Sequence, residues 1–94
     1  MGKDLHSLEL LERHHKFPGA YTFKVIAFHG PGLASELAAA VRGVVGREPR
    51  ELSTRPSRSG RYLGVTLEVD VASAGEVLKI YEALKDVEGI VVLV

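Results

Sequence analysis

The sequence predicts an α+β domain in which two helices cover one face of an antiparallel sheet, and three observations lead to this prediction. Apolar and polar residues alternate along 61–71, as expected of a strand with one buried face. Apolar residues recur at spacings of three and four along 32–45 and again after Ser73, as expected of amphipathic helices. These segments follow one another in the order βαββαβ, which favours a two-layer sandwich.

The chain begins with a predicted helix over residues 4–15. Asp4 is a suitable N-cap, and an apolar stripe follows it. Pro18 and Gly19 then end the segment. We therefore divide the chain into an N-terminal helical extension, residues 1–17, and a main domain, residues 18–94. The members of the stripe are Leu5, Leu8, Leu10 and Leu11.

The first strand is predicted over 21–28, and a Gly-Pro-Gly turn separates it from the helix at 32–45. Gly30 is expected to be the N-cap and Pro31 the first helical residue, where a missing N–H costs nothing. Gly46 suits a left-handed C-terminal cap.

The second half of the chain supplies three further strands and a helix. A polar edge strand is expected at 51–55, followed by a loop at 56–60 and the strand at 61–71. Ser73 and Glu76 form a capping box that starts the next helix. The unbroken apolar run at 90–94 predicts an interior strand. Right-handed crossovers then give a ferredoxin-like sheet with strand order 4-1-3-2.

Composition excludes several classes of protein. The chain has 94 residues, no cysteine and a formal net charge of zero, so disulfides and thiolate chemistry are ruled out. No apolar run approaches the roughly 18–20 residues of a membrane span, and the N-terminus lacks a signal-peptide core. We expect a cytoplasmic protein without a membrane association.

Charge is unevenly distributed along the chain. Residues 42–61 hold six arginines and two glutamates, whereas residues 62–94 hold six acids and two lysines. Two solvated faces of opposite sign explain this pattern, and so does self-association or an anionic partner at the arginine-rich loop.

The turn at 29–33 is the candidate ligand site. Its members are His29, Gly30, Gly32 and Leu33, and the amides at the start of the helix could meet a carboxylate or phosphate. Simple helix initiation is the alternative interpretation. Histidines at 6, 14, 15 and 29 lack a metal-binding spacing, so no metal or other cofactor is expected. No catalytic constellation is present, and we expect a non-enzymatic protein.

The face of the sheet opposite the helices is the candidate interface. It should carry Ile26, Phe28, Tyr62 and Thr66, an apolar patch that a homodimer could bury. The N-terminal helix, folded back as a lid, is the alternative. An ion pair between Lys24 and Glu68 is expected on the same face. RNA binding is a second candidate function, but Gly64 and Leu67 stand where stacking aromatics belong, which argues against nucleic acid as a partner.

Two stretches resemble known families. His29-Gly-Pro-Gly-Leu33 before an alanine-rich helix resembles the turn of ACT-type regulatory domains, which implies a βαββαβ fold, dimerisation and amino-acid binding near the turn. ACT domains usually have aspartate or asparagine where this chain has His29.

A closer resemblance, over about residues 10–94, is to the YbeD-like family of small bacterial proteins. It rests mainly on Phe17-Pro-x-x-Tyr-Thr-Phe-Lys-Val25 and on Val77-x-x-Ile-Tyr-x-x-Leu84. The family implies an ACT-like fold but no established activity. The expected function is therefore that of a small regulatory or interaction module, which binds a small anion or docks on a metabolic enzyme.

Overall fold

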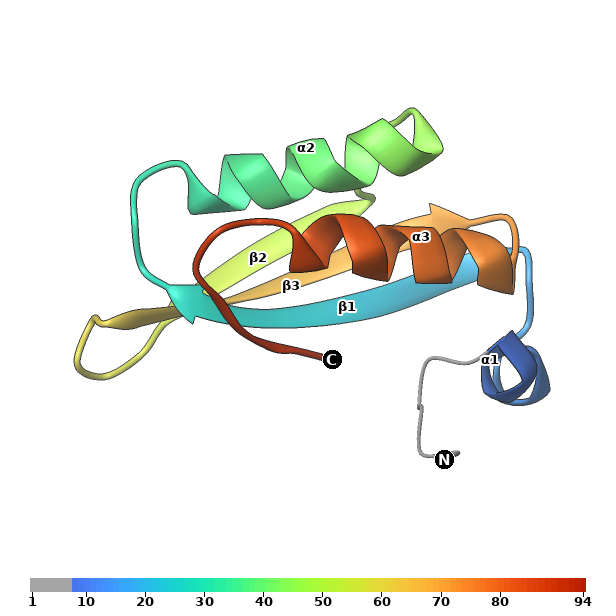
Figure 1. The fold of residues 1–94 in the computed structure, drawn as a ribbon, viewed down its shortest axis with the longest axis horizontal. Coiled ribbons are helices and arrows are strands. Elements are labelled where there is room, and N and C mark those ends of the chain that lie inside the picture. The colour runs from blue at the N-terminus through green and yellow to red at the C-terminus, as the bar shows by residue number, and fades with distance from the viewer. Residues whose placement is uncertain (1–7) are drawn as a thin grey trace.

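A four-stranded antiparallel sheet forms one layer of the molecule and two helices form the other. The computed structural model describes residues 8–94. The two long helices lie together over one side of the sheet, and a short N-terminal helix lies beside one end of the sandwich (Figure 1). The elements are α1 (Leu8–His14), β1 (Gly19–Phe28), α2 (Leu33–Val45), β2 (Glu51–Pro56), β3 (Tyr62–Val71), α3 (Ala74–Lys85) and β4 (Ile90–Leu93).

The strand order is β2-β3-β1-β4, which is the predicted order 4-1-3-2 read from the other edge. The two central strands pair over their whole length, from Gly19 opposite Val71 to Phe28 opposite Tyr62. A period of two then places Phe23, Val25 and Ala27 beneath the helices. The structure thus confirms the predicted α+β fold class.

One core fills the space between the layers. From the strands come buried Phe23, Val25, Val65, Leu67 and Val69, and from the helices Leu37, Val41, Val77, Ile80 and Leu84. Leu37 is fully buried, as its place in the apolar stripe of 32–45 predicts. Tyr81 brings the one hydroxyl into the core of residues 8–94, and no charged side chain is buried there.

The helix termini confirm one predicted cap and correct another. Ser73 Oγ accepts the Glu76 N–H at 3.2 Å, and the Glu76 carboxylate accepts the Ala72 N–H at 2.8 Å. The capping box is therefore present, with its return bond one residue earlier than usual. Gly30 as N-cap was wrong: the N-cap of α2 is Gly32, with φ +80°. A left-handed backbone at position 32 favours glycine over other residues. Gly32 therefore precedes the helix, and Leu33 is its first residue.

The last strand corrects a second prediction. The apolar run at 90–94 indicated an interior strand, but β4 lies at the edge of the sheet. Only Ile90 and Leu93 are partly buried, whereas Val91 and Val92 are exposed by 48% and 42%. The reason is that helices cover only one face, so half of the run has nothing to pack against.

The N-terminal helix α1 is tied to the core by one leucine and a group of aromatic rings. Leu11 is 2% exposed and belongs to the core, while Leu8 is 47% exposed. His15 follows the helix and packs at an angle against Tyr21, with ring centroids 4.9 Å apart. The predicted cap at Asp4 and the stripe residue Leu5 lie outside the described residues.

Next to His15, two tyrosines share a hydrogen bond. The hydroxyls of Tyr21 and Tyr81 are 3.1 Å apart, and the Tyr81 ring meets Phe23 edge-on at 4.9 Å. Burial, followed by the hydrogen bond and the charge of Tyr21, raises the pKa of Tyr81 above its usual range. The neutral hydroxyl is therefore the form that suits the fold.

Replacement of Leu37 by alanine tests the packing of α2. Leu37→Ala should lower the free energy of unfolding by about 2–5 kcal/mol, because it removes a fully buried side chain and leaves a cavity. Urea unfolding measures this. Exposed Ser35 on the same helix is the control, and Ser35→Ala should change stability by less than about 0.5 kcal/mol. A loss below about 1 kcal/mol for Leu37→Ala would contradict the observed helix face.

The hydrogen-bonded tyrosine pair should make the protein less stable at alkaline pH. A raised pKa in the folded protein means that stability is intact below the unfolded value of about 10 and falls as pH rises above it. Urea unfolding between pH 9 and 11 should show this loss. Tyr81→Phe should remove the Tyr81 contribution and flatten the profile, and an identical slope in both proteins would refute the assignment.

Candidate functional site

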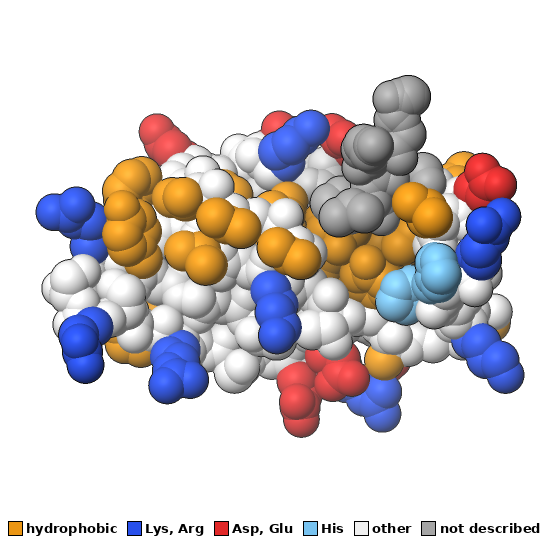
Figure 2. All heavy atoms as spheres, turned by 90° about the horizontal axis from the view of Figure 1, so that it is seen from below, with side chains coloured by type: hydrophobic (Ala, Val, Ile, Leu, Met, Phe, Trp, Pro, Cys, Tyr) orange, Lys and Arg blue, Asp and Glu red, His pale blue; other side chains and the backbone are white. Residues whose placement is uncertain are grey.

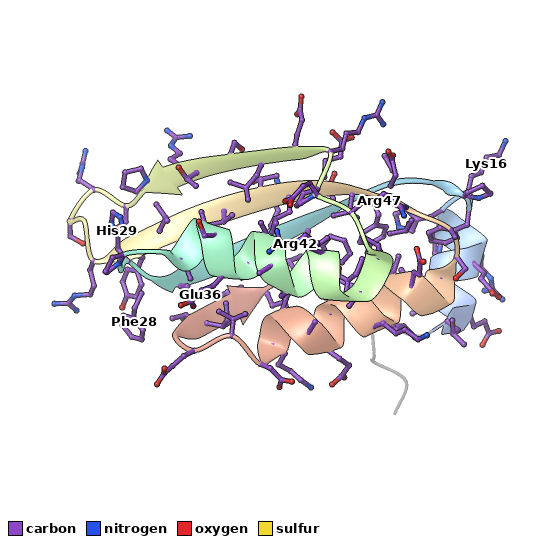
Figure 3. All side chains as sticks on the ribbon, turned by 90° about the horizontal axis from the view of Figure 1, so that it is seen from above. Lys16, Phe28, His29, Glu36, Arg42 and Arg47 are labelled. Carbon is purple, nitrogen blue, oxygen red and sulfur yellow. The ribbon has the colours of Figure 1, made fainter. Side chains whose placement is uncertain are left out.

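Backbone hydrogen bonds hold the turn between β1 and α2, one of them within the turn and one to the residue that precedes β3. The His29 N–H donates to Arg61 O at 2.8 Å, and the Leu33 N–H donates to Gly30 O at 3.4 Å. Pro31 has no N–H. Leu33 is a core residue with 5% exposure, whereas His29 is exposed beside Phe28 at the end of β1 (Figure 3). The amide of Leu33 is thus already engaged, and anion binding at this turn stays a prediction.

The opposite face of the sheet, here called the open face, carries no helix among residues 8–94. The strand register arranges its side chains in rows that run across the sheet. Phe28 and Tyr62 form the first row, with ring centroids 5.4 Å apart. The second row is Val92, Ile26, Gly64 and Arg55, and the third is Val94, Lys24, Thr66 and Ser53.

An apolar stripe runs over the β1 and β4 side of this face. Its members are exposed by 42–60%, which is high for large hydrophobic side chains on a small domain. Figure 2 looks onto this face and shows hydrophobic side chains along much of its length, from the end opposite the histidines to a second group beside them. The stripe consists of Ile26, Phe28, Val92 and Val94.

The four residues predicted as an interface all lie on the open face. Ile26 and Phe28 belong to the stripe, and Tyr62 and Thr66 lie beside them on β3. The described part of the N-terminal extension does not form a lid over them: α1 packs on α3 through Leu11, and Ile26 and Phe28 stay 43% and 55% exposed.

A groove lies on the other side of the open face, where β2 and β3 approach their connecting loop. Its volume is about 840 Å³, within the range of small-molecule sites. Sequence reasoning missed it, because the register of β2 against β3 cannot be read from the chain. The groove is lined by Val25, Ile26, Ser53, Thr54, Arg55, Pro56, Ser57, Arg58, Tyr62, Gly64, Val65 and Thr66.

The six arginines of residues 42–61 separate into two groups. Arg42 pairs with Glu48 at 2.8 Å, Arg50 pairs with Asp70 at 3.3 Å, and Arg47 donates to the carbonyl of Asp70. Among residues 8–94, the guanidinium groups of Arg55, Arg58 and Arg61 have no hydrogen-bond or ion-pair partner.

The side-chain ammonium of Lys24 is likewise without a hydrogen-bond or ion-pair partner among the described residues. The expected Lys24–Glu68 ion pair was wrong, because the register sets Lys24 opposite Thr66 and Glu68 opposite Thr22. The open face is therefore basic near the β2–β3 loop and acidic at its other end, where Glu51 and Glu68 face each other.

No group of three potential metal ligands occurs among residues 8–94. Histidines 14 and 15 are consecutive, and the ring of His15 packs on Tyr21 and Phe17. Within the same residues, no helix is long and apolar enough to cross a membrane.

Fold and open face together define a ferredoxin-like domain, with one face of its sheet left without a helix by residues 8–94. A solution structure of protein HP0495 from H. pylori has the same fold, with a TM-score of 0.74 at 15% sequence identity over 85% of each chain. The similarity at this identity concerns the fold alone.

Sequence comparison then identifies the family. The chain belongs to the family described as Protein of unknown function (DUF493), which matches residues 12–94 and confirms the YbeD-like resemblance. A UPF0250 protein of Shewanella piezotolerans is 33% identical over 82 residues, 87% of this chain and 88% of the relative. Similar UPF0250 proteins occur in Leptothrix cholodnii, with 33% identity over 73% and 77% of the two chains, and in Bordetella pertussis, with 30% over 85% and 89%.

Proposed function

We propose that this chain is a small, non-enzymatic regulatory module that acts through its open face, and that the apolar stripe is the contact for a second copy. The observation that carries the proposal is the exposed apolar stripe of Ile26, Phe28, Val92 and Val94 on a face that carries no helix among residues 8–94. Burial of large hydrophobic side chains is the main driving force for association, and patches of this kind mark interaction sites.

The charge distribution supports a second copy as the occupant. Lys24 and Arg55 lie toward the basic end of the face, and Glu51 and Glu68 lie at the acidic end. A two-fold axis that runs across the strands at the Ile26 row sets stripe against stripe and places Glu51 and Glu68 of one copy toward the basic β2–β3 loop of the other. Such closed pairs are the commonest homo-oligomers, and the charges would select this orientation over the parallel one.

The position of the open face gives a way to regulate the pairing of copies. The open face is formed by the same strands, β1 and β3, whose other side builds the core. A ligand or a metabolic enzyme that binds this face would change the fraction of paired copies, because pairing and binding would use overlapping residues. This role requires no catalytic group.

Sedimentation equilibrium of the full chain tests the proposal. Wild-type protein should be dimeric at micromolar concentration, and Phe28→Asp should be monomeric because a charge enters the apolar contact. Leu8→Asp is the matched control: Leu8 is 47% exposed but lies on α1, outside the apolar stripe, and the variant should remain dimeric. A monomeric wild type, or dissociation by both variants, would overturn the proposal. Removal of the whole extension is a poorer test, because Leu11 is part of the core.

RNA binding is the second candidate, and one specific observation favours it. The Phe28–Tyr62 ring pair lies on the open face near the unpaired Arg55, Arg58 and Arg61. Exposed rings and cations are the elements with which proteins hold single strands. This alternative predicts a gel shift with mixed-sequence RNA that weakens with salt and with Tyr62→Ala. The regulatory module predicts no shift.

A further inference from the structure

We propose that the groove beside the β2–β3 loop binds a small organic anion. Arg55 and Arg58 hold its carboxylate or phosphate, and its apolar part lies over Gly64 between Ile26 and Tyr62. This site lies away from the helix N-terminus at Gly32, and it is a ligand site in addition to the contact between copies.

A missing side chain creates the groove. In the second row of the open face, Gly64 lies between Ile26 on β1 and Arg55 on β2. The neighbouring rows place Tyr62 and Thr66 on the same strand, above and below the glycine. The result is a trough with a backbone floor, one apolar wall and one cationic wall. An amphipathic ligand matches these walls better than a bare ion or a hydrocarbon does.

The cationic wall carries no internal counter-charge. The twelve lining residues include Arg55 and Arg58 but neither aspartate nor glutamate. Neither guanidinium has a partner among residues 8–94, in contrast to Arg42 and Arg50, which pair with acids. Guanidinium groups present a planar fork of donors that fits carboxylate and phosphate oxygens. An anion would therefore gain these bonds without breaking an existing ion pair.

The loop that carries Arg58 is ordered by its own hydrogen bonds. The Ser57 N–H donates to Tyr62 O at 2.8 Å, the Tyr62 N–H donates to Ser57 Oγ at 3.1 Å, and the Gly60 N–H donates to Ser57 O at 2.9 Å. These bonds close the β2–β3 hairpin beside the groove. A fixed loop reduces the entropy lost on binding, which favours a ligand site here.

Polar groups along the groove add donors and acceptors. The hydroxyl residues Ser53 and Thr66 line it together with Tyr62, on strands rather than on the loop. A few polar groups among apolar ones are typical of sites that orient a small ligand. The ligand class is thus an organic anion that joins an acidic group to an aromatic or aliphatic portion.

Phenyl phosphate is the probe, titrated into the full ¹⁵N-labelled chain while amide chemical shifts are recorded. The largest shifts should occur at Tyr62, Gly64 and Thr66. Inorganic phosphate alone and benzyl alcohol alone should each bind at least about tenfold more weakly than phenyl phosphate. Phosphate can contact only the cationic wall, and benzyl alcohol has no charge for that wall and can contact only the apolar one. Sedimentation at the same concentrations reports the state of assembly, so that loss of binding is distinguished from loss of pairing.

Three variants locate the site. Gly64→Leu should fill the trough and weaken binding by about tenfold or more. It should still fold, because Gly64 has no positive φ and an added Cβ would lie 3.5 Å from Arg55 O, an ordinary contact. Arg55→Gln with Arg58→Gln should weaken binding similarly. Arg61→Gln is the matched control, since it removes an unpaired arginine of the same hairpin that does not line the groove.

The outcomes are decisive in either direction. Equal weakening by Arg61→Gln would indicate diffuse charge attraction and overturn the site. Amide chemical-shift changes centred on Gly30–Leu33 would show that the ligand binds at the turn and not in the groove. If an oligouridylate binds and phenyl phosphate does not, the groove is a nucleic-acid site and not a site for a small organic anion. The exposed arginine variants keep the test valid even if Gly64→Leu fails to fold.

Discussion

The ten-residue pairing of β1 with β3 is the constraint on which the rest of the structure depends. Because side chains alternate along both strands, this one register sends Phe23, Val25, Val65 and Leu67 into the core. The same register leaves Ile26, Lys24, Gly64 and Thr66 on the open face. A slip by one residue would exchange the two sets, so the core and the candidate binding surface are determined together.

Two helices are enough to cover one face of four strands but not both. The core therefore lies on one side, without buried charged side chains in residues 8–94, while apolar residues of β4 and β1 stay in contact with solvent. This imbalance is what makes the open face a candidate for association. The described N-terminal helix leaves this imbalance in place, because α1 contributes Leu11 to the core while Ile26 and Phe28 stay exposed.

The stripe and the groove lie side by side and share Ile26, which couples the proposed pairing to the proposed ligand. If a second copy covers the open face, a ligand over Gly64 is either enclosed or excluded by it. In both cases ligand concentration and pairing are thermodynamically linked, and the linkage is reciprocal. A regulatory module needs no more than this: a small domain whose assembly responds to an anion.

The sequence by itself determined the helices, the strands, the strand order and the family, because periodicity, the Ser73–Glu76 box and the Phe-Pro-x-x-Tyr-Thr-Phe-Lys-Val string are local signals. It also placed Ile26, Phe28, Tyr62 and Thr66 on one face, since a period of two suffices for that. Only the tertiary structure decided which residues of different strands are neighbours. The strand register places Gly64 between Ile26 and Arg55, and it places Lys24 opposite Thr66 instead of Glu68. The start of α2 at Gly32, and not at Gly30, depends likewise on a left-handed backbone that neither glycine reveals in the sequence.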